Sequence, residues 1–234
     1  MQNVNADRRA WLNRSLAMAG LAGAGSLGLS GAVFAQSGGG YVEGRHYQRL
    51  AQALPVSVPA GKVEVIEFFS YACPHCNAFE PALAAWSKKL PADVVFRRIP
   101  VNFLVNAENF QRLYFALEAL GQVEAMQAKV FAAVHVQRER LASPDAVADF
   151  VAKNGIDRAK FLDAFNAFGV QAKVRQVPAQ ISAFKIDGVP SLAIQGHYVT
   201  SPSMAGAEGM PVELQHSRCL ELTDQLIARA RKGA

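Results

Sequence analysis

The apolar positions of this 234-residue chain follow two periods, one typical of strands and one typical of helices. Val63–Tyr71 is mostly apolar, which predicts a strand buried on both faces of a sheet. Val94–Val101 shows a similar pattern one helix later, at the place where a βαβ crossover puts its second strand. His46–Leu50 predicts a short edge strand. The elements therefore begin in the order β-β-α-β.

The segment between the two long strands has the helical period. One face of the helix that starts at Cys73 carries a stripe of buried-type side chains, namely Cys76, Phe79, Leu83 and Trp86. Pro81 lies inside this helix, and we expect a kink there because proline removes a backbone hydrogen bond and clashes with the preceding turn.

Helical periodicity dominates from Asn106 to about Phe184. A first apolar stripe is formed by Phe110, Leu113, Tyr114 and Leu117. Further helices are predicted at Val123–Val136, Pro144–Lys153, Asp157–Phe168 and Lys173–Phe184, the last of them bent at Pro178. This block of helices separates the early strands from the late ones and predicts an insertion into the sheet-forming domain.

The pattern of the C-terminal part returns to strands. Asp187–Ile194 and Gln195–Val199 predict a hairpin that closes the other edge of the sheet. Pro190 stands at the entry of its first strand, where a residue without a backbone N–H is tolerated, and on its own it predicts an ordinary trans bond. A last helix is predicted at Pro211–Ala230, with an apolar face made of Val212, Cys219, Leu220, Leu226 and Ile227.

The N-terminal segment is typical of an export signal. Arg8, Arg9 and Arg14 precede an uncharged stretch, and small residues around Ala35 form a cleavage site. We expect a secretory signal peptide at residues 1–35. The adjacent arginines also resemble the twin-arginine export motif, so the ordinary secretory route and the twin-arginine route both stay open. Either route leads to the periplasm, where disulfides form and persist.

The charge balance argues against a dedicated nucleic-acid surface. The chain has 24 Lys and Arg against 19 Asp and Glu, and the counts fall to 21 and 18 without the predicted signal peptide. No Lys/Arg-rich cluster accompanies this small excess. The 199 residues that remain are enough for one domain carrying an insertion.

The chemistry of the chain is concentrated in Cys73-Pro74-His75-Cys76, at the junction of the first long strand and its helix. A reversible disulfide fits this spacing, because Cys73 lies at the helix start and Cys76 lies one turn later. The unsatisfied N–H groups and the positive end of the helix dipole favour a thiolate there. Pro74 suits the first helical position because it has no N–H group to satisfy. We expect His75 to stabilise the Cys73 thiolate, the alternative being a solvated histidine without a role.

Three other interpretations of the cysteine pair are weaker. A structural zinc site needs four ligands, usually from two such pairs, and the chain has only one further cysteine, Cys219. Haem attachment requires a histidine directly after Cys76, where Asn77 stands. An inert structural disulfide stays open, although so short a loop gains little chain entropy.

The remaining titratable residues suggest one further participant. Cys219 is expected to be a small buried hydrophobe, with a resolving or intermolecular thiol as the alternative. Glu67 is an acid in the middle of a buried strand, so it either faces a polar channel or assists proton transfer near Cys76. Four histidines show no ligand spacing and are interpreted as surface or satisfied side chains: His46, His135, His197 and His216.

The cysteine pair at a strand-to-helix junction, Pro81 within the helix and the Val189-Pro190 pair together resemble the thioredoxin superfamily. Within it, the helical insertion and the Pro74-His75 dipeptide resemble the DsbA family of bacterial periplasmic thiol:disulfide oxidoreductases. The resemblance extends over essentially the whole mature chain and includes the segments Glu67–Ser70, Asn77–Glu80 and Pro100–Phe103. It implies an α/β thioredoxin fold, a mixed central sheet flanked by helices, with an inserted helical subdomain.

The expected boundaries follow from the signal-peptide pattern and from this resemblance. The signal peptide occupies residues 1–35, the first part of the thioredoxin-like domain residues 36–104, the helical insertion residues 105–179 and the second part of the domain residues 180–234. The resemblance further implies a cis peptide bond at Val189-Pro190, packed against the disulfide. It places Glu67 and Glu80 beside the site and Arg98 facing them, where the family more often has lysine. The implied catalytic residues are Cys73, Pro74, His75, Cys76, Glu67, Val189 and Pro190, with no metal or organic cofactor.

The chain is therefore predicted to be a periplasmic dithiol oxidase that donates the Cys73–Cys76 disulfide to exported proteins with free thiols, through a mixed disulfide. The resemblance implies reoxidation by a quinone-linked inner-membrane partner of the DsbB kind and an apolar substrate groove beside Pro190, and we expect a monomer. A disulfide isomerase or reductase of the same superfamily is an alternative, although only about 27 residues (36–62) are left for a separate dimerisation domain. The second alternative is a chaperone-like binding module with a vestigial cysteine pair.

Overall fold

The computed structural model describes residues 40–233. The signal peptide and cleavage site predicted at residues 1–35 lie outside the described residues.

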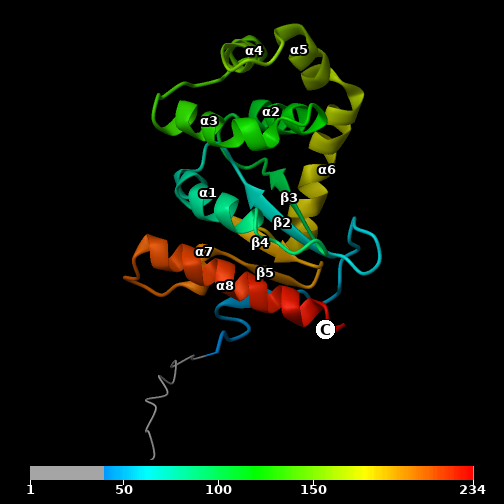
Figure 1. The fold of residues 1–234 in the computed structure, drawn as a ribbon, viewed down its shortest axis with the longest axis vertical. Coiled ribbons are helices and arrows are strands. Elements are labelled where there is room, and N and C mark those ends of the chain that lie inside the picture. Colours follow the sequence, from blue (N-terminus) through cyan, green and yellow to red (C-terminus); the bar gives the residue numbers. More distant parts are fainter. Residues whose placement is uncertain (1–39, 234) are drawn as a thin grey trace, which may run out of the picture. The chain divides into compact units, whose positions relative to one another are not determined.

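The centre of the fold is a mixed five-stranded sheet in the order β1-β5-β4-β2-β3 (Figure 1). The strands are β1 (Tyr47–Arg49), β2 (Val63–Phe69), β3 (Val94–Pro100), β4 (Ser191–Ile194) and β5 (Tyr198–Thr200). Only β2 and β3 run parallel, and the other neighbours are antiparallel. Every residue of β2 is buried, as the sequence predicts for a strand covered on both faces.

The late hairpin takes a different place from the one predicted. β4 pairs with β2 and β5 pairs with β1, so the hairpin lies inside the sheet and β1 forms the edge. The prediction that the hairpin closes the other edge is therefore wrong. Its tight turn and its two strands are present as predicted.

Eight helices are described within residues 40–233. They are α1 (Pro74–Ser87), α2 (Ala107–Ala119), α3 (Val123–His135), α4 (Pro144–Lys153), α5 (Arg158–Asn166), α6 (Phe168–Phe184), α7 (Pro202–Ala205) and α8 (Val212–Ala230). In Figure 1, α2 to α5 gather beyond one end of the sheet and α6 runs back toward β4. α6 begins at Phe168, five residues before the predicted start at Lys173, and the short helix α7 is missed by the sequence pattern.

The two faces of the sheet bury two separate clusters, because successive strand side chains point to opposite sides. Ile66 and Phe68 of β2 face the cluster that includes the helices between β3 and β4. Val65 of β2 faces the other cluster, with Phe79 and Leu83 of α1 and the apolar face of α8. The site at the end of β2 is therefore fixed from both faces.

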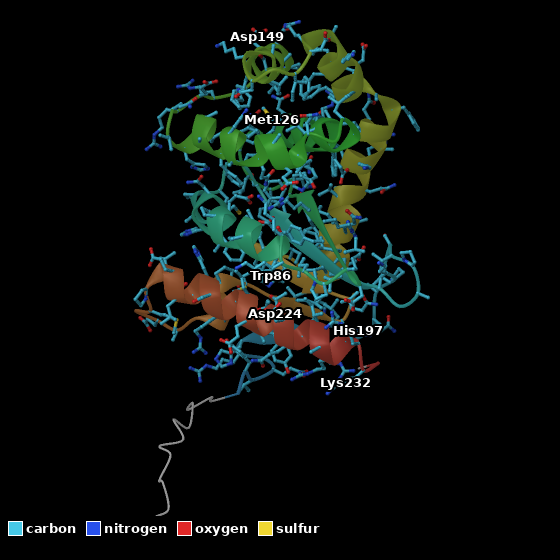
Figure 2. The ribbon with its side chains drawn as sticks, in the orientation of Figure 1. Trp86, Met126, Asp149, His197, Asp224 and Lys232 are labelled. Carbon is cyan, nitrogen blue, oxygen red and sulfur yellow. The ribbon has the colours of Figure 1, made fainter. Side chains whose placement is uncertain are left out.

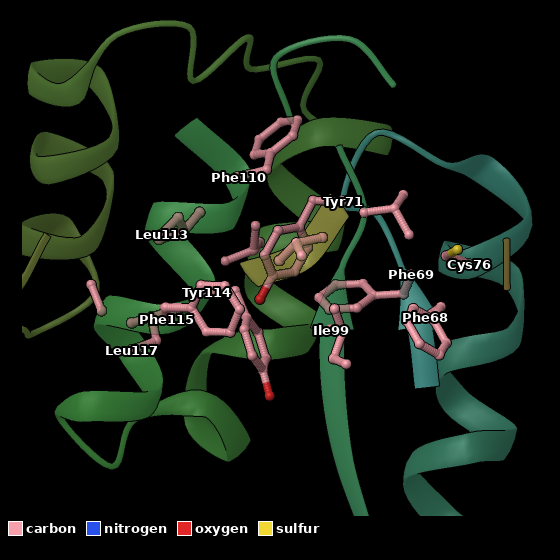
Figure 3. Close-up of a cluster of buried hydrophobic side chains, with 14 of the residues drawn as sticks. Phe68, Phe69, Tyr71, Cys76, Ile99, Phe110, Leu113, Tyr114, Phe115 and Leu117 are labelled. Atoms are coloured by element: carbon pink, nitrogen blue, oxygen red, sulfur yellow. The ribbon is translucent and has the colours of Figure 1, made fainter. Parts of the chain in front are cut away.

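Aromatic rings hold the end of β2 against the inserted helices (Figure 3). The ring centroids of Phe69 and Tyr114 are 5.4 Å apart, and those of Tyr71 and Phe131 are 5.1 Å apart. Tyr71 also meets the ring of Phe110 edge-on. Edge-to-face pairs of this kind add to the burial energy, so the chain just before Cys73 has little freedom.

α8 covers the second face and buries Cys219 completely. Side-chain contacts also join α8 to α1: the indole nitrogen of Trp86 donates a hydrogen bond to Asp224 at 2.9 Å, and both residues are labelled in Figure 2. Val212, predicted on the apolar face, is 46% exposed at the start of the helix. The sequence pattern is thus right for the middle of α8 and wrong for its first turn.

We predict that Gly196→Ala destabilises the protein much more than Gly155→Ala. Both glycines have positive φ, but only at Gly196 would a Cβ atom collide with the backbone of Leu54, while nothing lies near Gly155. The expected loss of unfolding free energy is about 2–3 kcal/mol at Gly196 and about 1 kcal/mol at Gly155. Urea unfolding of both variants measures these losses. Equal losses would show that the close approach of Gly196 to the Leu54 backbone does not matter.

We predict that the Cys219 thiol reacts with a thiol reagent only on unfolding. Its side chain is fully buried, and burial raises the pKa of the thiol. The measurement uses a variant in which Cys73 and Cys76 are alanine, so that Cys219 is the remaining thiol. Labelling in the folded state at the rate of a free peptide cysteine would show that Cys219 is reactive.

Candidate active site

The first cysteine stands where β2 turns into α1. Cys73 is the N-cap of α1, with an extended backbone (φ −87°, ψ 117°), and Pro74 occupies the first turn as predicted. An N-cap residue faces backbone N–H groups that have no partner within the helix. The Cys73 sulfur fills the place that an Asp or Ser oxygen usually takes.

Two contacts hold the Cys73 sulfur. The backbone N–H of Cys76 donates a hydrogen bond to it at 3.4 Å, and the Cys73 thiol donates one to the carbonyl oxygen of Val189 at 3.4 Å. The Val189-Pro190 peptide bond is cis, as the resemblance implies. Val189 and Pro190 are thus brought to the cysteine from a loop more than a hundred residues away in the sequence.

The two thiols differ sharply in acidity. Hydrogen bonding from the Cys76 thiol is the largest influence on the pKa of Cys73, which is lowered to about 6. Burial opposes this, while the backbone N–H groups of Cys76 and His75 and the charge of His75 add to it. Cys76 is fully buried, and burial raises the pKa of its thiol strongly. Both cysteines are free thiols, so the structure represents the reduced site.

A buried ion-pair cluster lies behind the cysteines. The Nε atom of Arg98 donates to Glu67 at 2.7 Å, and its Nη2 atom donates to both carboxylate oxygens of Glu80 at 3.0 and 3.1 Å. Glu67 comes from β2, Glu80 from α1 and Arg98 from β3, so three elements meet in this cluster. Arg98 therefore faces both acids, as the resemblance implies.

The acids of this cluster are unusually weak. Burial raises the pKa of Glu67 to about 7, although the charge of Arg98 acts in the opposite direction. Burial also raises the pKa of Glu80, again against Arg98. Burial is the largest cause that raises the pKa of the Cys76 thiol, and the negative charge of Glu67 acts in the same direction. A carboxyl group that titrates near neutrality beside a thiol is suited to proton exchange with it.

A groove of about 730 Å³ runs beside Pro190. Its lining combines apolar side chains, such as Val189, Pro190 and Met204, with polar and charged ones, such as Arg45, His75 and Lys185. The groove is therefore only partly apolar, which corrects the apolar lining implied by the resemblance. Val189, which lines the groove, is also the residue whose carbonyl oxygen contacts the Cys73 sulfur.

Two histidines that the sequence analysis gave no role lie close to the site. His216 is buried, lines the groove and packs its ring against Phe79 of α1 at 5.0 Å. The Nε2 atom of His135 lies 2.8 Å from the backbone oxygen of Tyr71, two residues before Cys73. Neither residue is near the cysteines in the sequence, so only the fold reveals their position. His75 itself is exposed at the start of α1.

Sequence reasoning also misses the buried pair Tyr71 and Gln127. The Tyr71 hydroxyl donates a hydrogen bond to the side-chain oxygen of Gln127 in α3 at 2.6 Å. Both side chains look like ordinary helix and strand residues in the sequence, and no spacing connects them.

Within residues 40–233, no three His, Cys, Asp or Glu side chains are grouped so that they could hold a metal ion. In the same part of the chain, no helix has the length and apolar character needed to cross a bilayer.

Comparison with known proteins gives a consistent result. A family model described as the DSBA-like thioredoxin domain matches residues 64–213. The thiol:disulfide interchange protein DsbA of Burkholderia cepacia is 43% identical over 178 residues, which cover 76% of this chain and 84% of that protein. The DsbA protein of Pseudomonas aeruginosa strain PAO1 is 38% identical over 194 residues, covering 83% of this chain and 88% of that protein.

A solved structure extends the likeness to the fold. The crystal structure of Pseudomonas aeruginosa DsbA matches with a TM-score of 0.76 at 36% identity, over 82% of this chain and 96% of that one. The mixed sheet flanked by helices is thus the thioredoxin-like fold predicted from the sequence. Relatives named for thiol:disulfide interchange support a disulfide oxidoreductase role. The matched domain and the extent of these likenesses show that the chain belongs to the DsbA family.

Proposed function

We propose that this chain is a periplasmic dithiol oxidase that donates a Cys73–Cys76 disulfide to exported proteins with free thiols. The observation that carries the proposal is the state of Cys73: its sulfur caps α1, receives the Cys76 N–H and has a pKa of about 6. A stable thiolate is a good leaving group, and it stabilises the reduced protein relative to the disulfide. Such a couple is oxidising, so it transfers its disulfide to other dithiols.

The first step breaks the enzyme's own disulfide. A client thiolate attacks the Cys73 sulfur, a new S–S bond forms between client and Cys73, and Cys76 leaves. The Cys76 thiolate is unfavourable because it is fully buried. Glu67, whose pKa is about 7, is the group proposed to give it a proton.

The second step releases the client. Its second thiolate attacks the client sulfur of the mixed disulfide, the client disulfide forms, and Cys73 leaves as a thiolate. The client loses two electrons and two protons, and the enzyme gains two electrons as one thiol and one thiolate. In reoxidation, the Cys73 thiolate attacks the disulfide of the oxidising partner, and one partner sulfur leaves as a thiolate. Cys76 then returns its proton to Glu67 and attacks the Cys73 sulfur, so that the Cys73–Cys76 disulfide forms and the other partner sulfur leaves with the two electrons.

The remaining assignments follow from this chemistry and from family membership. We propose that a client segment lies in the groove beside Pro190 and that a quinone-linked inner-membrane protein of the DsbB kind reoxidises the site. Residues 1–35 are proposed to direct export to the periplasm, and the mature chain is proposed to act as a monomer. The helical insertion is proposed to occupy residues 105–179, and the thioredoxin-like domain residues 36–104 and 180–234. The roles of Pro74, His75, Val189 and Pro190 are proposed to be the positioning of the Cys73 sulfur and of the client chain.

The equilibrium of the Cys73–Cys76 couple with glutathione tests the proposal against its alternatives. An oxidase gives a couple more oxidising than glutathione, whereas a reductase gives a more reducing one. If the couple does not exchange with glutathione at all, the result favours the chaperone-like binding module. Oxidation of a two-cysteine peptide by the purified mature chain completes the test.

We predict that Cys73 of the reduced protein titrates with a midpoint near pH 6. The lowered pKa adds stability to the reduced protein that is full above the unfolded pKa of about 8.5 and is lost as pH falls through the folded value near 6. Thiolate absorbance measures the midpoint, and thermal unfolding from pH 8 to pH 5 measures the stability. His75→Ser should raise the midpoint. A midpoint near that of a free thiol would rule out the oxidase.

We predict that Glu67→Gln slows oxidation of a dithiol peptide by up to about tenfold below pH 7 and has less effect above it. The protonated form of Glu67, which can donate to Cys76, disappears as pH rises through about 7. Glu64→Gln is the matched control, because Glu64 is an equally buried acid of β2 that pairs with Arg97 instead. The ratio of wild-type to variant rates across pH is the measurement. Equal ratios for both variants would remove Glu67 from the mechanism.

A further inference from the structure

The groove beside the cis proline carries an excess of positive charge. Its lining has two residues that are cationic at any ordinary pH, Arg45 and Lys185, and one acid, Asp187. The other titratable side chains of the lining are His75 and His216, whose protonated forms add to the positive charge. The steps proposed above use the groove only as a place for the client chain, and its charge has no part in them.

Both cations are available to a ligand. Arg45 and Lys185 are exposed, and neither forms a salt bridge with another residue of the described part of the chain. Asp187 forms none either, so it does not neutralise the lysine by direct contact. Charges that line a concave site attract a ligand of the opposite sign, because the low-dielectric walls concentrate their field.

Lys185 occupies a backbone conformation in which glycine is the usual residue. It ends α6 with φ 54° and ψ 43°, in the left-handed region, where a side chain is less favourable than the hydrogen of glycine. A lysine there also interacts favourably with the negative end of the helix dipole, as Lys153 does in the last turn of α4. Lys153 does not line the groove, so a comparison of the two lysines separates a role in the groove from a role at a helix end.

The position of Lys185 limits where an acid must stand in a client. The carbonyl oxygen of Val189 lies 3.4 Å from the Cys73 sulfur, which the client sulfur joins in the mixed disulfide. Lys185 precedes Val189 by four residues, and that length of chain spans at most about 14 Å. An extended client covers the same length with about four residues. An acidic side chain this close to the reacting cysteine is therefore within reach of the lysine.

We propose that Arg45 and Lys185 are specificity-determining residues that make the groove favour extended client segments with acidic side chains within about four residues of the reacting cysteine. The proposal rests on the dithiol oxidase function proposed above and names a class of client for it. Ion pairs between exposed groups are modest in strength, so the preference is a difference in rate and does not exclude neutral clients.

Oxidation of matched peptides tests the proposal. Three short peptides with two cysteines differ only at the positions that flank the cysteines, which hold Asp, Asn or Lys. We expect the oxidised mature chain to oxidise the Asp peptide with a kcat/KM about three- to tenfold above that of the Asn peptide, and the Lys peptide more slowly than both. The ratio should approach one in about 0.5 M salt, because salt screens exposed charges. A fourth peptide, with its Asp residues moved well beyond four residues from either cysteine, should lose the advantage.

Charge reversal identifies the residues responsible. Lys185→Glu and Arg45→Glu should each reduce the advantage of the Asp peptide over the Asn peptide. Lys153→Glu is the matched control, because it changes the net charge of the protein and the charge at a helix end by the same amount, and it should leave the ratio unchanged. Lys185→Gly should also reduce the ratio, while its thermal unfolding temperature does not fall, since glycine is favoured in the left-handed conformation. A merely structural role for this lysine would not move the ratio.

The outcomes separate this proposal from the proposed function. An advantage of the Asp peptide that falls in both the Lys185 and the Arg45 variants and persists in Lys153→Glu supports the proposal. Equal rates for the three peptides overturn it, and so does an advantage that either groove variant retains in full or that the Lys153 control loses to the same extent. If the glutathione equilibrium shows a reducing couple, the oxidase function fails. The same comparison, made with the reduced chain and the disulfide forms of the peptides, then still tests the preference of the groove.

Discussion

The hydrogen bond from the first turn of α1 to the Cys73 sulfur is the interaction on which the rest of the site depends. It requires β2 to end a few residues before the helix, so that Cys73 stays extended while Cys76 is already helical. It also requires Cys76 to be buried, because the same geometry places the second thiol inside the protein. One thiol is therefore made acidic and the other is deprived of solvent. In the proposed function, this difference in acidity between the two thiols makes the pair an oxidising couple.

In the mechanism proposed above, burying Cys76 creates a second requirement, which is a source of protons that does not come from bulk water. Glu67 is the proposed source, and its cluster with Glu80 and Arg98 places three ionisable groups in the core. Each group comes from a different element, so the cluster also depends on the correct pairing of β2 with β3 and on the packing of α1. Chemistry and fold are thus coupled through the same three residues.

Much of the fold could be predicted from the sequence, because β2, α1 and α8 have clear hydrophobic periods and Pro144 and Gly155 mark helix ends. The edge position of β1 is also predicted, but the position of the β4–β5 hairpin inside the sheet is not, since such short strands do not encode their partners. Cys73 and Cys76 could be found from their spacing alone, and Val189, Pro190 and Arg98 only through a resemblance. Gln127 and His135 could be found neither from spacing nor from a resemblance, because their contacts with Tyr71 join segments that no local pattern connects.

The place of Arg97 and Arg98 on β3 has a consequence for solubility. β3 is an outer strand of the sheet, and an uncovered outer strand can add strands from other polypeptides. A protein whose proposed clients are unfolded chains meets many such strands. Arg98 points inward to Glu67 and Glu80, while Arg97 pairs with Glu64, so the strand carries charge on both faces. A strand added at this edge would have to desolvate the charge of Arg97, whose side chain keeps 28% of its surface exposed, so the neighbour of the buried cluster opposes growth of the sheet.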